Sequence, residues 1–168
     1  MKSKLFLIAV MVMALAASAA AKTKATGTVS CAKPNPGYSI PVADQAGHAL
    51  TVGKSACTWT KPMEIAGLKT KEGADVVYGD AMGTEVHTWG YHVSNMSNGD
   101  KMFVKFQGKD IMTKDGKPAT TEGTWSYTGG TGKLKGIKGG GTYKGKADAA
   151  GNMAVEVEGM HEMPAAMK

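Results

Sequence analysis

The sequence predicts an all-β fold, a single antiparallel barrel of about eight strands, from three observations. Glycine makes up about 16% of residues 22–168, twice its usual share of roughly 7%. Apolar and polar residues alternate over short stretches, and no ten-residue stretch there has a helical period. These stretches are joined by turns that contain Gly and Asp, which is typical of barrels and sandwiches. We expect at most one short helical turn.

The N-terminal segment has the pattern of a secretory signal peptide. A basic start precedes the apolar run 5–17, and small residues follow it. We expect residues 1–21 to be removed, with cleavage after Ala19 or Ala21, and residues 22–168 to form one periplasmic or secreted domain. The apolar run is shorter than the roughly 20 residues of a transmembrane helix. We therefore expect no membrane association after cleavage.

Eight strands are expected along the rest of the chain. By residue number they span 25–32, 55–60, 74–78, 84–96, 101–107, 119–128, 141–147 and 153–159. Segment 33–47 holds three prolines, so we expect a long loop or a ragged edge there. One short helical turn is expected at 64–68. From about residue 160 onward we expect a flexible tail.

The dipeptide 98–99, Asn-Gly, is the strongest hairpin signal in the sequence. It suits a two-residue type I′ turn, in which both residues have positive φ. Such a turn pairs Tyr91 with Phe106, and paired residues share a face of the sheet. The side chains then expected inside the barrel are Glu85, His87, Trp89, Tyr91, Val93, Met102, Val104 and Phe106. The same alternation predicts that His92 points outward.

Cys31 and Cys57 are the two cysteines of the chain. In an exported protein an even pair favours a disulfide over a metal or redox site. Such a bond would stabilise the fold by about 3 kcal/mol in the loop-entropy model. Two buried free thiols are the alternative.

The charged residues argue against nucleic acid as a partner. Every basic side chain is a lysine, and the formal net charge of +6 falls to +4 without Lys2 and Lys4 of the leader. Arginine supplies the planar group that grips phosphates and base edges. We therefore expect the lysines to form a solvated surface.

Residues 123–145 are the most glycine-rich part of the chain. A phosphate-binding loop is excluded there, because Tyr127 and Leu134 occupy the positions where that motif needs Gly and Ser or Thr. The run from Gly129 to Tyr143, together with the segment 57–62, resembles small secreted bacterial barrels that are grouped with allene-oxide-cyclase and dirigent-type barrels. The resemblance implies an eight-stranded, calycin-like barrel with a central cavity. It carries over no catalytic residue.

The expected interior face offers the main candidate site. Our leading hypothesis is that Trp89, Tyr91, His87 and Phe106 bind a small apolar or aromatic ligand inside the barrel. An isomerase or cyclase that uses His87 with Glu85 is the alternative, because an imidazole titrates near neutral pH. A third hypothesis is a non-catalytic envelope or structural protein in which the aromatic residues are plain core. We favour binding over catalysis and expect no cofactor.

The C-terminal residues Met160, His161 and Met163 are a weaker candidate for a metal site. Thioethers and imidazole suit Cu(I). The alternative is a flexible tail in a methionine-rich protein, with no metal bound. The sequence does not indicate an oligomeric state.

Overall fold

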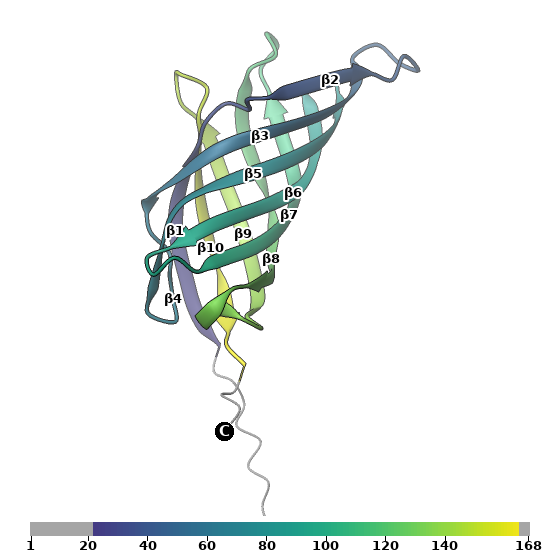
Figure 1. Ribbon diagram of the computed structural model, residues 1–168. Helices are drawn as coiled ribbons and strands as arrows, with labels where there is room; N and C mark the ends of the chain where they lie inside the picture. The colour runs from purple at the N-terminus through teal and green to yellow at the C-terminus, as the bar shows by residue number, and fades with distance from the viewer. Residues whose placement is uncertain (1–21, 165–168) are drawn as a thin grey trace, which may run out of the picture.

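The computed structural model describes residues 22–164, so the expected signal peptide lies outside the described residues. Within this range the chain forms ten strands and one 3₁₀ turn. They are β1 (Thr23–Cys31), β2 (Gly37–Pro41), β3 (His48–Lys61), β4 (Glu64–Ile65), β5 (Leu68–Met82), β6 (Glu85–Met96), β7 (Lys101–Met112), β8 (Pro118–Gly130), η1 (Gly132–Leu134), β9 (Lys138–Ala147) and β10 (Met153–Glu162). Eight strands close into an antiparallel barrel in the order β1-β10-β9-β8-β7-β6-β5-β3, and β3 pairs back onto β1 (Figure 1). The predicted barrel is confirmed.

Strand β2 lies inside segment 33–47, where we expected a long loop or a ragged edge. It pairs with β3 from Gly37 opposite Gly53 to Pro41 opposite Ala49. Since β1 pairs with the later part of β3, β1 and β2 lie one after the other along the same side of β3. All its residues are exposed, as suits an edge strand that ends in proline. Of the two alternatives expected for 33–47, a long loop or a ragged edge, the middle part is an edge strand.

Strand β4 and the turn η1 lie at one end of the barrel (Figure 1). Buried apolar side chains of these segments close that end. Met63, Ile65 and Leu134 are at most 1% exposed there. The turns between β5 and β6, β7 and β8, and β9 and β10 lie at the opposite end. The end with β4 and η1 is therefore packed with apolar side chains, whereas the opposite end consists of these three turns.

The short helical turn expected at 64–68 is wrong. Ile65 and Leu68 pair across the two residues Ala66 and Gly67, whose φ angles are 51° and 75°. Two successive positive φ values define a type I′ hairpin turn. The one helical turn in the described part of the chain is η1 instead.

The register predicted for the β6–β7 hairpin is wrong by one residue. The Met96 N–H donates to the Asp100 carbonyl at 2.8 Å, and Gly99 has a φ of 89° while Asn98 keeps a negative φ. The loop is therefore three residues long and ends in a left-handed glycine. A shift of one residue turns every side chain of β6 to the other face. Gly90, and not Tyr91, is the residue opposite Phe106.

Large aromatic rings inside the barrel lie over glycines of neighbouring strands. A Cβ on Gly27 would come within 2.7 Å of the Trp59 ring, and a Cβ on Gly159 within 2.6 Å of the Trp125 ring. Because these glycines have no Cβ, the tryptophan rings can occupy the space above them. This packing accounts for part of the high glycine content.

The C-terminal strand is longer than predicted. β10 continues to Glu162, so residues 160–162 are paired in the sheet and do not begin a flexible tail. In residues 22–164 no helix has the length and apolar character needed to cross a bilayer.

Candidate functional site

The barrel encloses a cavity of about 670 Å³. It extends from Trp59 and Met63 near the closed end to Gly83, Gly116 and Gly151 in the turns at the other end. Most of its lining side chains are apolar. They include Val29, Val77, Val104, Phe106, Trp125, Val155 and Val157. The volume falls within the range of roughly 300–1,000 Å³ that is common for small-molecule sites.

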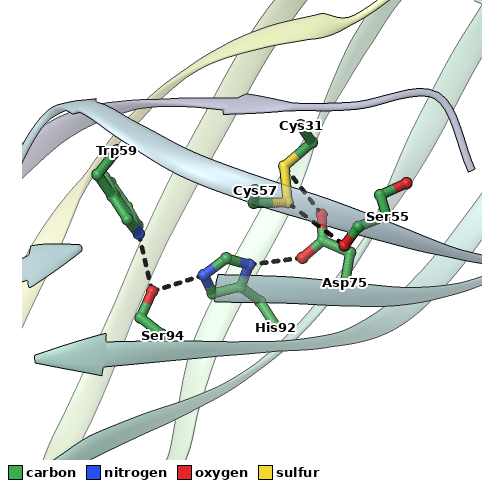
Figure 2. A network of polar contacts seen from close by, with 7 residues as sticks. All are labelled: Cys31, Ser55, Cys57, Trp59, Asp75, His92 and Ser94. Carbon is green, nitrogen blue, oxygen red and sulfur yellow. Dashed lines mark hydrogen bonds and ion pairs between the residues drawn. A yellow bond between two sulfur atoms is a disulfide. The ribbon is translucent and has the colours of Figure 1, made fainter. Parts of the chain in front are cut away.

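Four side chains, Asp75, His92, Ser94 and Trp59, form a chain of hydrogen bonds (Figure 2), and all of them except Ser94 line this cavity. The Nδ1–H of His92 donates to Asp75 Oδ1 at 2.5 Å, because an ionised carboxylate can only accept. With the proton on Nδ1, His92 Nε2 accepts the Ser94 hydroxyl at 2.6 Å, and Ser94 Oγ in turn accepts the indole N–H of Trp59 at 2.8 Å. His92 is 8% exposed and Ser94 is fully buried. Both ring nitrogens of this buried histidine are therefore satisfied.

Strand pairing explains why these residues meet. Asp75 on β5 lies directly opposite His92 on β6, so the two side chains share the inner face. Gly73 makes room for the ring, because a Cβ there would come within 3.0 Å of His92 Nε2 and 2.4 Å of the Val93 carbonyl oxygen. The network thus depends on both the register and one glycine.

The predicted disulfide between Cys31 and Cys57 is confirmed and lies beside this network (Figure 2). Its two cysteines are directly paired residues of β1 and β3. Sγ of Cys31 is 3.4 Å from Asp75 Oδ2, but a disulfide sulfur has no proton to donate. The two sulfurs and the Asp75 carboxylate lie within 4.8 Å of one another, yet the S–S bond makes them unsuitable as metal ligands.

The order Ser94, His92, Asp75 is that of a nucleophile, a base and an orienting carboxylate. Two features argue against nucleophilic catalysis. Ser94 has no exposed surface and already accepts the Trp59 N–H. It also lies in a paired stretch of β6, where the ladders to β5 and β7 use the backbone N–H groups that an oxyanion hole would need. The network is better suited to present a polar wall to a ligand.

A second polar group lies nearer the turns. Burial, together with the charges of Asp110 and Asp75, raises the pKa of Tyr143 to about 12, and the hydroxyls of Thr88 and Thr121 oppose this rise. Burial also raises the pKa of Asp110. A hydrogen bond from Thr121 to the carboxylate opposes this rise. The cavity therefore holds a second carboxyl group that has no basic partner among these contacts.

Three of the four predicted ligand-binding residues do not face the cavity. Trp89 is 46% and Tyr91 56% exposed, and both point away from the barrel interior, as does His87. Phe106 alone lines the cavity as predicted. The interior placement of the other three was wrong because the turn after β6 has one residue more than we assumed.

His87 and Glu85, the predicted catalytic pair, do meet, but on the outer surface. His87 Nε2 is 3.4 Å from Glu85 Oε1, and Lys109 Nζ is 3.1 Å from the other carboxylate oxygen. The His87 side chain is 69% exposed. This pair cannot reach a ligand inside the barrel.

Asp75, His92 and Ser94 are the site residues that sequence reasoning missed. One signal for them was present in the sequence. If Gly90 faces Phe106, the glycine leaves space for the ring, whose tip would lie 2.7 Å from a Cβ at that position. That pairing requires the observed register and turns His92 inward.

The predicted metal candidates at the C-terminus are divided between two faces. Met160 is 39% exposed on the outside, whereas His161 is 4% exposed and Met163 packs against the core. Nδ1 of His161 is buried without a hydrogen-bond partner. Burial lowers the pKa of this histidine.

No protein-family model matches the chain, and no curated protein matches it significantly. The resemblance to allene-oxide-cyclase and dirigent-type barrels therefore stays a prediction.

Proposed function

We propose that this protein binds a small, largely apolar molecule inside its barrel. The observation that carries the proposal is the cavity of about 670 Å³ with its mainly apolar lining. Burial of apolar ligand surface supplies the driving force, and a few polar groups orient the ligand. The aromatic walls are Trp59, Trp125 and Phe106, in place of the predicted Trp89 and Tyr91.

The polar groups of the cavity favour a neutral or cationic ligand over an anion. Asp75 and Asp110 line it, whereas its basic groups are His92, bonded to Asp75, and Lys33, which is exposed in the loop after β1. A ligand carboxylate would face two carboxyl groups at low dielectric. A ligand hydroxyl or amine can donate to them instead. A neutral alcohol or a primary amine with an apolar body fits best.

We also propose that the protein is exported. The support is the basic start, the apolar run 5–17 and the small residues before position 22. The Cys31–Cys57 disulfide is compatible with an oxidising compartment. Intact-mass measurement of the chain recovered from a periplasmic or culture fraction tests this, since a chain that still carries residues 1–21 would contradict it.

Two neighbouring valines of β5 provide a matched test of ligand binding. Val77 lines the cavity, whereas Val76 is 36% exposed on the outer face. Val77→Phe fills part of the cavity, so we expect it to weaken binding of the neutral apolar probe N-phenyl-1-naphthylamine by about tenfold or more. Val76→Phe should bind like wild type. Fluorescence titration measures both. Absence of binding to the wild type, or equal binding by both variants, would contradict the proposal.

Acid–base catalysis on a bound ligand is the second candidate function. The contact of His92 with Asp75 favours it, since it orients the imidazole at the cavity wall, and Nε2 would serve a ligand by exchanging Ser94 for it. This pair replaces His87 and Glu85 in the isomerase hypothesis. If a turnover is found, His92→Gln should abolish it while probe binding persists. Turnover that survives in a folded His92→Gln variant rules this candidate out.

A further inference from the structure

A second pocket lies at the closed end of the barrel, away from the ligand cavity. His161, Met163 and Glu64 are among its lining residues, and none of its lining residues lines the large cavity. It is formed where β10 ends beside β1 and the β4 turn. A ligand of this pocket would therefore contact none of the residues that line the large cavity.

His161 is held in this pocket without a protein partner. Its backbone is paired with Thr23 on β1 and Gly139 on β9, which fixes the side chain on the inner face. The residue is 4% exposed, and its Nδ1 has no hydrogen bond. Most buried polar side-chain atoms have such a bond, so this one needs an explanation.

Met163 brings a soft donor to the same pocket. It follows His161 by two residues, directly after the end of β10, and both residues line this pocket. Its side chain packs against the core. Met160, by contrast, points outward and is 39% exposed. The thioether of Met163 and the imidazole of His161 are thus the two soft or borderline donors of this pocket, which Glu64 also lines.

We propose that this pocket binds Cu(I), with the His161 imidazole and the Met163 thioether as ligands. Thioether and imidazole donors together select Cu(I), whereas structural zinc sites use thiolates, imidazoles and carboxylates. Both cysteines of the chain are held in the disulfide, so no thiolate competes for the metal.

Competition with a chromophoric Cu(I) chelator tests the site. Bicinchoninate competes with residues 22–168 for Cu(I) that is added anaerobically as its acetonitrile complex, without a thiol reductant, so that the disulfide stays intact. We expect one Cu(I) per chain and a loss of affinity of about tenfold or more in both His161→Asn and Met163→Leu. Met160→Leu is the matched control and should bind like wild type.

A spectroscopic measurement on the unaltered chain keeps the test independent of variant folding. The methionine methyl groups are labelled with ¹³C, and Ag(I) is added as a redox-inert substitute for Cu(I). We expect the Met163 methyl signal, assigned from Met163→Leu, to shift at one equivalent while that of Met160 does not. A stationary Met163 signal overturns the proposal. So does Cu(I) affinity that is unchanged in Met163→Leu or in a folded His161→Asn variant.

Discussion

Two buried histidines of this barrel, His92 and His161, differ in the hydrogen-bond partners of their ring nitrogens. His92 is 8% and His161 4% exposed, so both have lost almost all contact with water. His92 has a partner at each ring nitrogen, whereas Nδ1 of His161 has none. An unpaired buried polar group costs about 1–3 kcal/mol. The difference suggests that the fold itself supplies the partners of the His92 ring nitrogens and that a ligand supplies the missing partner of His161.

Replacing each histidine by leucine should give the largest difference between the two in the free energy of unfolding. His92→Leu leaves the Asp75 carboxylate, whose side chain is only 18% exposed, without its partner, so we expect the free energy of unfolding to fall by about 3 kcal/mol. His161→Leu removes an unsatisfied nitrogen, and we expect a change of less than about 1 kcal/mol, or a gain. Urea unfolding with the disulfide intact measures both. Equal losses in the two variants would contradict the comparison.

The hydroxyl of Ser94 should contribute less to the free energy of unfolding than the His92–Asp75 pair does. Ser94→Ala removes the acceptor of the Trp59 indole N–H and the partner of His92 Nε2. We expect it to lower the free energy of unfolding by about 1–2 kcal/mol. Ser30→Ala is the control, because Ser30 lies on the outward face of β1 and its side chain makes no hydrogen bond within the described chain. If the Ser94 variant is as stable as this control, the network does not stabilise the barrel.

The pH dependence of stability is the smallest expected effect. Burial lowers the pKa of His161 below its usual 6.5, so the unfolded chain takes up this proton first as the pH falls. The folded state therefore loses stability below about pH 6.5, down to the folded-state pKa. His161→Leu lacks this loss, so its stability relative to wild type should rise between pH 7.5 and pH 5. Thermal unfolding at stepped pH values measures the difference. A difference that stays constant over this range would show that the imidazole is not desolvated.

The barrel and the disulfide were predictable from the sequence because they rest on periodicity, glycine content and one cysteine pair. The inner face of β6 was not, because it depends on whether the turn at Asn98-Gly99 has two or three residues. The dipeptide suits both, since either turn places Gly99 at positive φ. Hydrophobicity then favoured the wrong face, because the exposed Trp89 resembles core and the buried His92 resembles surface. Only packing over Gly90 and the partners of His92 decide between them.

Native mass spectrometry of the untagged protein tests the central claim, a ligand inside the barrel, most directly. Wild type, Val77→Phe and Val76→Phe are purified in parallel and incubated with decan-1-ol, decylamine or decanoate. We expect one bound molecule of the alcohol or the amine in wild type and Val76→Phe, and loss of that mass in Val77→Phe. Preferred binding of decanoate would contradict the polar arrangement around Asp75 and Asp110. No added mass with any of the three, in a protein that also fails to bind N-phenyl-1-naphthylamine, would contradict the claim itself.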